Sequence, residues 1–347
     1  VLELLQTPPE ILDAAHSYII IIFWGIGAAM LFNLLSNVIR ALGDSRTPLY
    51  FLVLACVLNI ALDLALILRF GMGPAGAAVA TVVSQLVSGL LCTIYVFRKF
   101  PMLRLTRADW NMSRRYLWAH IRLALPMGFQ ASIIAIGAIL VQFALNRLGA
   151  QAVAAFSAAQ KIDMVATLPM MSFGIAMATY VAQNYGARNP LRIRQGVLQC
   201  SLMSVGFSIA VAVVNIIWGP ELIRLFVGTG EREVVRLAQI YLNINASMYW
   251  VLALLFVFRY TLQGLGQSVV PTFAGVMELA MRAFAAIILA RYLGFAGASM
   301  ASPAAWIGSC VPLAIAYFFT RKRLAQSTKQ PFPPCSGEER ESIRQAA

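Results

Sequence analysis

Asp63 is the residue of this sequence best placed to do chemistry, because it lies inside an apolar run of about 20 residues, long enough to cross a bilayer. Inserting a carboxylate at that depth costs about 2.5–3.5 kcal/mol, so such residues usually face a cavity, an ion or a partner. Asn59 precedes it by four residues and therefore shares its helix face. Together they predict a binding site for a small hard cation or a proton. A static hydrogen-bonded network of Asp63, Asn59 and Tyr18 is the alternative interpretation.

Composition defines the elements that must position Asp63. The chain is 60% hydrophobic and 12% charged, and its mean hydropathy is +0.76, which is far too apolar for a soluble domain of this size. The net charge of +13 does not indicate nucleic-acid binding, because the basic residues lie in short loops between apolar runs. No metal-ligand spacing, and hence no cofactor site, is visible among the cysteines Cys56, Cys92, Cys200 and Cys310. The fold class is therefore predicted to be all-α, a polytopic membrane helical bundle.

Nine spans are predicted from hydropathy, all helical because lipid cannot satisfy exposed backbone groups. Alternate connections, at residues 40–46, 98–115, 188–194, 259 and 321–323, hold most of the cationic side chains. The positive-inside rule makes these connections cytoplasmic, so the C-terminus is expected inside and Val1 outside, in a bacterial plasma (inner) membrane. The predicted spans are residues 14–39, 49–69, 75–97, 120–147, 152–184, 196–218, 237–259, 270–291 and 297–320.

An internal repeat relates the first three spans to the last three. A shift of 223 residues places Tyr18 on Tyr241, and residues 42–43 and 98–99 on identical or equivalent pairs. The copies are an even number of spans apart, which predicts a parallel repeat with one orientation in the membrane. Spans 4–6 have no partner in this sequence. The expected whole is therefore a twelve-helix protein in two lobes, of which this chain lacks the first three helices.

An ordered set of motifs carries a family resemblance over about residues 8–323. Together they resemble the multidrug and toxic compound extrusion (MATE) transporters, with the DinF-like branch fitting best. The motifs are RALGDSRTP (40–48), NIALD (59–63), GPAGAAVATVVSQ (73–85), LGAQAVAAF (148–156), VAQNYGA (181–187), LQGLGQSVVPT (262–272) and GFAGASMAS (294–302).

The resemblance implies a secondary antiporter that exports small organic, often cationic, compounds as Na⁺ or H⁺ moves inward, with no other cofactor. It assigns the coupling cation to Asp63, Asn59, Thr81 and Tyr18. A monomer in the lipid bilayer is expected. The implied organisation is part of an N-lobe at residues 1–97, a basic cytoplasmic connection at 98–119, a C-lobe at 120–323 and a disordered cytoplasmic tail at 324–347.

The second copy of the repeat has not kept the cation site. Arg282, Ala286 and Ser302 occupy the places of Asn59, Asp63 and Thr81. Glu278 lies four residues before Arg282, and we expect the two to form a structural ion pair on one helix face.

Other polar and adaptable side chains are weaker candidates. Lys161 and Asp163 line the cavity or lie near the interface, two possibilities that the sequence leaves open. Substrate-cavity residues are suggested by polar or polarisable side chains, although such residues also serve as helix-packing filler. The candidates are Gln130, Gln142, Asn146, Met170 and Phe173.

Two other functions have requirements that the sequence does not meet. A lipid-linked oligosaccharide or lipid flippase of a related bundle class would need an arginine-rich cavity, whereas only Arg282 and Lys161 are candidate embedded cations. A membrane-embedded enzyme would need a metal or nucleophile constellation, and none is visible. The chain is therefore expected not to be an enzyme.

Overall fold

The computed structural model describes residues 9–104, 114–228 and 231–327. It separates into two compact units: the N-unit, whose described part is residues 9–104, and the C-unit, Met112–Pro334. Residues 105–113 of the expected basic connection and 328–347 of the expected tail lie outside the described residues. The last helix continues to Ser327, past the point where the tail was expected to begin.

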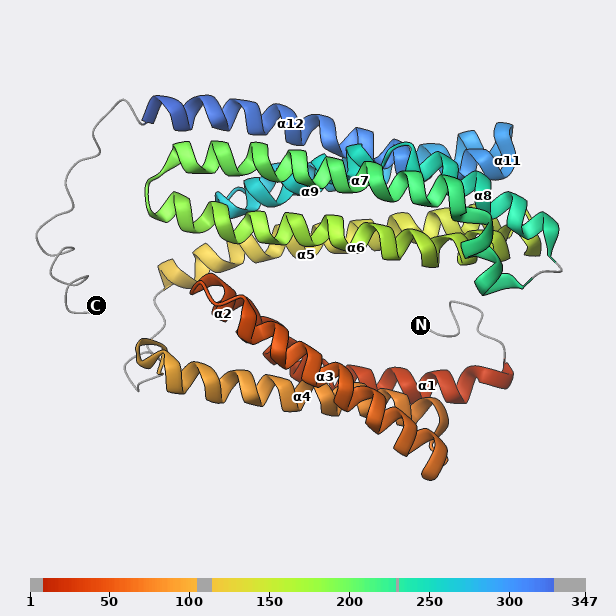
Figure 1. The fold of residues 1–347 in the computed structure, drawn as a ribbon, viewed down its shortest axis with the longest axis horizontal. Helices are drawn as coiled ribbons and strands as arrows, with labels where there is room; N and C mark the ends of the chain where they lie inside the picture. Colours follow the sequence, from red (N-terminus) through yellow and green to blue (C-terminus); the bar gives the residue numbers. More distant parts are fainter. Residues whose placement is uncertain (1–8, 105–113, 229–230, 328–347) are drawn as a thin grey trace, which may run out of the picture. The chain divides into compact units, whose positions relative to one another are not determined.

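The N-unit is built of helices, shown in red to orange in Figure 1. Its first two helices bend by 46° at Gly25. A Cβ atom at Gly25 would lie 2.1 Å from a methyl carbon of Val82, so only glycine lets this bend approach the helix that carries Val82. The elements are α1 (Pro9–Trp24), α2 (Ile26–Ala41), α3 (Arg46–Leu64), a π-helical turn (Ala65–Arg69), α4 (Gly73–Lys99) and a 3₁₀ turn (Pro101–Leu103).

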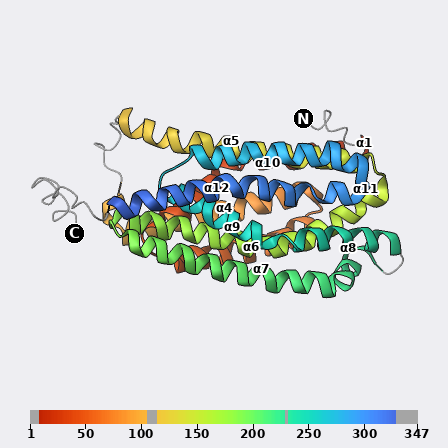
Figure 2. The same ribbon diagram turned by 90° about the horizontal axis from the view of Figure 1, so that it is seen from above.

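The helices of the C-unit run side by side (Figures 1 and 2). Their buried residues include one cluster rich in small side chains such as Ala155 and Ala159, and a second cluster with larger ones such as Tyr249 and Leu255. The elements are α5 (Arg114–Asn146), α6 (Ala150–Gly186), α7 (Pro190–Val227), α8 (Arg232–Ala246), α9 (Tyr249–Gly264), α10 (Val269–Phe284), a π-helical turn (Ala285–Leu289), α11 (Ala290–Ser299) and α12 (Ala301–Ser327).

Seven helices of the described chain are long and apolar enough to cross a membrane, and the count reaches nine when each of two bent pairs is one span. The bent pairs are α1 with α2 and α8 with α9. The predicted fold class, an all-helical membrane bundle with about nine spans, is confirmed by this arrangement.

The repeat seen in the sequence reappears in the irregularities of the helices. The α8–α9 pair bends by 49°, close to the 46° of α1–α2. A π-helical turn follows α3 at Ala65–Arg69, and another follows α10 at Ala285–Leu289. A bend followed by a π-helical turn thus recurs in the same order in both triplets of spans.

The position of Arg259 corrects the prediction that this residue lies in a cytoplasmic connection. The residue lies within α9 and only 6% of it is exposed. Its guanidinium group is 2.7 Å from a carboxylate oxygen of Glu278. It therefore cannot contribute to the charge count that orients the chain.

The turn between α2 and α3 is organised by Asp44. One carboxylate oxygen accepts hydrogen bonds from the backbone N–H groups of Arg46 and Thr47, at 3.2 and 3.1 Å. The other accepts from the hydroxyl of Tyr95 and lies 3.2 Å from Nζ of Lys99. These bonds, that from Tyr95 above all, hold the pKa of Asp44 well below its ordinary value. The carboxylate thus caps α3 and fastens it to the end of α4.

We expect Asp44→Ala to lower the stability of the protein by about 0.5–2 kcal/mol, the usual cost of losing a helix cap. Asp44→Asn should cost less, because an amide oxygen still caps the helix. Since the folded-state pKa is lowered, the contribution of the charge is present above pH 3.8, the ordinary value, and is lost as the pH falls below it. Thermal unfolding of the three proteins across acid pH measures this. An equal pH dependence in wild type and Asp44→Asn would contradict it.

Candidate functional site: a buried carboxylate in the N-unit

Asn59 and Thr81 come together across the α3–α4 contact. The side-chain amide of Asn59 donates to Oγ1 of Thr81 at 3.5 Å, and that hydroxyl donates to the carbonyl oxygen of Ala77 at 3.0 Å. The amide group of Asn59 is thus turned toward Thr81, which leaves its own carbonyl oxygen available as an acceptor. Two of the four predicted cation-site residues therefore meet on neighbouring helices.

Asp63 lies one turn further along the same face of α3. Its Oδ1 atom is buried and has no hydrogen-bond partner among the described residues. No cationic side chain in the described part of the chain pairs with it. Buried carboxylate oxygens are nearly always satisfied. An unpartnered carboxylate oxygen one helical turn from Asn59 is a ligand of the kind that a proton or a small cation takes.

The backbone changes immediately after Asp63. Helix α3 ends at Leu64, and the chain continues as the π-helical turn Ala65–Arg69. Isolated π turns within helices often occur at functional sites, because they shift the helix face by part of a turn. Here the shift comes directly after the candidate carboxylate.

Tyr18 lies on α1 and 38% of it is exposed. Within the described structure it forms no hydrogen bond to Asp63, and neither does Asn59. The static network of Asp63, Asn59 and Tyr18 that was the alternative interpretation is therefore not formed. The assignment of Tyr18 to the site rests on the resemblance alone.

The equivalent place in the C-unit holds a charged cluster instead. Glu278 accepts hydrogen bonds from Arg259 at 2.7 Å and from Arg282 at 3.0 Å. Arg259 also donates to the hydroxyl of Ser309 at 2.9 Å. The predicted Glu278–Arg282 contact is present, but the sequence missed the second arginine. The sequence offered one signal for this second ion pair: Arg259 is a positive charge at the end of an apolar segment, where cationic residues are few.

Asp163 belongs to a second hydrogen-bonded chain in the C-unit. The hydroxyl of Tyr249 donates to Oδ1 of Asp163 at 2.7 Å, and the side-chain amide of Asn215 donates to Tyr249 at 3.1 Å. Lys161, by contrast, is exposed, with its ammonium group 5.5 Å from the ring centre of Phe226. The two residues that the sequence could not separate thus differ: Asp163 accepts a hydrogen bond from another helix, whereas Lys161 is exposed and lies over an aromatic ring.

The suggested substrate-cavity residues pack mainly within the C-unit. Met170 is completely buried in the core, so its side chain packs against other core residues and does not line an open cavity. Gln130 is also buried and accepts from Gln263 at 3.4 Å. The amide of Gln142 donates to Asn146 on the same helix at 3.0 Å, and the ring of Phe173 is 6.1 Å from that of Phe207.

The described helices form the bundle of an integral membrane protein. Its fold is that of a solved multidrug resistance MATE transporter of the MOP superfamily in an outward-facing conformation. The TM-score is 0.85 at 22% identity, covering 94% of this chain and 73% of the other.

The family follows from the sequence comparison. Residues 1–65 and 126–288 match the MatE family model, and the chain belongs to this family of membrane transporters, not to an enzyme family. The "Probable multidrug resistance protein YpnP" of Bacillus subtilis is 33% identical over 269 residues, covering 76% of this chain and 59% of the relative. The "Probable multidrug resistance protein YoeA" of the same organism is 26% identical over 333 residues, covering 93% and 72%. The chain thus spans less than two thirds of the length of YpnP.

Proposed function

We propose that this chain is part of a DinF-like, cation-coupled exporter of small organic compounds, with Asp63 as the seat of the coupling cation. The single observation that carries the proposal is the buried, unpartnered Oδ1 atom of Asp63. An intramembrane carboxylate without a partner is costly and is usually functional. Asn59, one helical turn before Asp63, and Thr81, which accepts a hydrogen bond from Asn59, would add neutral oxygens.

The coupling ion is Na⁺ or H⁺. A carboxylate with amide and hydroxyl oxygens suits a hard cation, because such ions prefer oxygen ligands. Protonation would serve equally, because a neutral carboxyl group donates its own hydrogen bond. In either case the ion drives transport only by binding one conformation of the protein more tightly than the other.

The names of the relatives support export, and the charge pattern supports one orientation in the membrane. The basic connections other than Arg259 support a cytoplasmic C-terminus, and the exporter would then lie in the plasma membrane of a bacterium. The printed names of YpnP and YoeA are those of multidrug resistance proteins, which supports export of varied organic compounds. A flippase gains no support, since the embedded Arg259 and Arg282 are both bound to Glu278.

Dye transport by the full-length protein in proteoliposomes tests the proposal. We expect uphill dye movement when a Na⁺ or proton gradient is imposed, and none when both gradients are absent. Replacing Na⁺ by choline at a constant pH gradient then separates the ions: transport stops if Na⁺ couples and continues if H⁺ does. Uphill transport without either gradient would contradict the proposal.

Thr81→Ala should weaken binding of the coupling ion while leaving the fold intact. Losing one neutral oxygen should raise the half-saturating ion concentration by about tenfold, equal to about 1.4 kcal/mol, with little change in the maximal rate. Thr93→Ala is the matched control, because Thr93 lies on the same helix and makes the same type of bond, to Gly89, at 2.8 Å. Equal ion dependence in the two variants would remove Thr81 from the site.

A further inference from the structure

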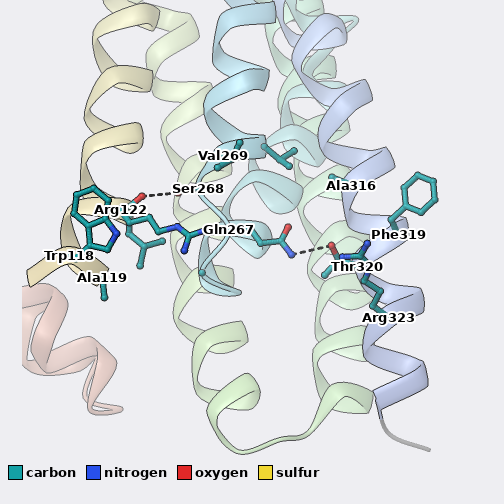
Figure 3. Close-up of a pocket in the computed structure, with 13 residues that line it drawn as sticks. Trp118, Ala119, Arg122, Gln267, Ser268, Val269, Ala316, Phe319, Thr320 and Arg323 are labelled. Atoms are coloured by element: carbon teal, nitrogen blue, oxygen red, sulfur yellow. Dashed lines mark hydrogen bonds between the residues drawn. The ribbon is translucent and has the colours of Figure 1, made fainter. Parts of the chain in front are cut away.

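A cavity of about 810 Å³ opens in the C-unit where three helices end. Figure 3 shows its walls: α5 contributes Trp118 and Arg122, the turn before α10 contributes Gln267 and Ser268, and α12 contributes Arg323. Neither Asp163 nor Glu278 lines the cavity, and none of its lining residues is acidic.

Two hydrogen bonds brace the cavity walls. The hydroxyl of Ser268 donates to the backbone carbonyl of Arg122 at 3.1 Å, which ties the start of α10 to α5. The amide of Gln267 donates to Oγ1 of Thr320 at 3.3 Å, which ties the same turn to α12. Both bonds are drawn in Figure 3. The space is therefore held open by the fold.

The charges around this space are uncompensated. The guanidinium groups of Arg122 and Arg323 are exposed and have no partner within the described structure. Helix α10 begins at the same turn, and no side chain caps its first N–H groups. Because the N-terminus of a helix carries a partial positive charge, it adds to the two arginines.

The N-unit copy of this turn shows what is missing. The 223-residue repeat places Gln267 on Asp44 and Ser268 on Ser45. In the N-unit, Asp44 supplies the anion: it caps α3 through Arg46 and Thr47 and binds Lys99. In the C-unit a neutral glutamine stands in that place, and its amide turns to α12 instead. The C-unit therefore lacks at this turn the internal anion that the N-unit carries, and two arginines, Arg122 and Arg323, line the cavity beside it.

We propose that this cavity binds the phosphate-bearing headgroup of an anionic membrane lipid. Two arginines and a helix N-terminus are the donors that proteins use for phosphate. The lipid source is favoured because the cavity lies at the ends of membrane-spanning helices, beside the exposed side chains of Trp118 and Phe319. Aromatic and basic side chains together are typical of the headgroup region.

The test uses the full-length protein in phosphatidylcholine nanodiscs into which phosphatidylglycerol is titrated, with bound lipid counted by native mass spectrometry and stability followed by thermal unfolding. We expect phosphatidylglycerol to bind in preference to phosphatidylcholine and to raise the unfolding temperature. Arg122→Gln combined with Arg323→Gln should weaken this binding by about tenfold or more. Lys322→Gln, which removes one positive charge from the residue next to Arg323 but outside the cavity lining, should leave the binding unchanged.

Gln267→Asp is the sharper variant, because it restores the anion that the N-unit carries. The new carboxylate should cap α10 as Asp44 caps α3, so that stability in pure phosphatidylcholine is kept or raised while the response to phosphatidylglycerol is lost. A response unchanged in Gln267→Asp and in the double arginine variant would overturn the proposal. So would stabilisation by inorganic phosphate alone with none by phosphatidylglycerol, which would make the ligand a free anion.

Discussion

Asp63→Asn should abolish ion-driven transport, reducing dye movement in proteoliposomes to the level of empty vesicles. The substitution keeps the size of the side chain and its remaining oxygen but removes the charge that a bound cation neutralises. Because the asparagine has no charge for the ion to neutralise, the ion no longer binds one conformation more tightly than the other. The ion gradient then cannot drive the conformational change. The fold should survive, because Oδ1 of Asp63 has no partner to lose in the described structure.

The matched control is Asp13→Asn, an identical change at an exposed carboxylate in the same unit. Its transport should equal that of the wild type. Unchanged uphill transport by Asp63→Asn at saturating gradients would show that the coupling charge lies elsewhere, with Asp163 of the C-unit as the next candidate.

Glu278→Ala should cause a large loss of stability, greater than that expected for Asp44→Ala. Glu278 is buried and binds two arginines, which are also largely buried. Removing it leaves two like charges without a counter-ion, and breaking a buried pair in this way typically costs about 3–5 kcal/mol. Heating the purified protein in detergent and measuring the fraction that remains monodisperse would report the loss.

Two further variants distinguish the loss of the buried ion pairs from a general sensitivity of the bundle to substitution. Glu233→Ala removes an exposed carboxylate that binds Arg236 at 2.7 Å, and it should change stability little, because solvent screens such a pair. Replacing Glu278, Arg259 and Arg282 together by Leu, Met and Met should recover most of the stability, because no buried charge then remains. A triple variant that is no more stable than Glu278→Ala would contradict the explanation by unpaired buried charges.

Much of the architecture was predictable because the bilayer restricts the choices. Lipid forces every spanning segment to be helical and sets its length, so hydropathy alone predicted about nine spans. The spacing of Asn59 and Asp63 fixed their common helix face in the same way. The repeat added a second constraint, and it reappears as paired bends of 46° and 49°.

The failures came from contacts between segments that are distant in the sequence. Arg259 reads as a loop charge because its counter-ion, Glu278, belongs to the next helix. The hydrogen bond between Asp163 and Tyr249 joins residues far apart in the chain, and no local sequence pattern predicts it. Met170 could have lined a cavity or filled a core, and only packing decides that it does the latter.

The most direct test of the central claim is a measurement of ion binding to the purified full-length protein, without transport. Infrared difference spectra on adding Na⁺, or on lowering the pH, should show one carboxylate changing its coordination or becoming protonated. This signal should be present in Asp13→Asn and absent in Asp63→Asn. A carboxylate signal of the same size in Asp63→Asn would contradict the assignment of the cation to this residue.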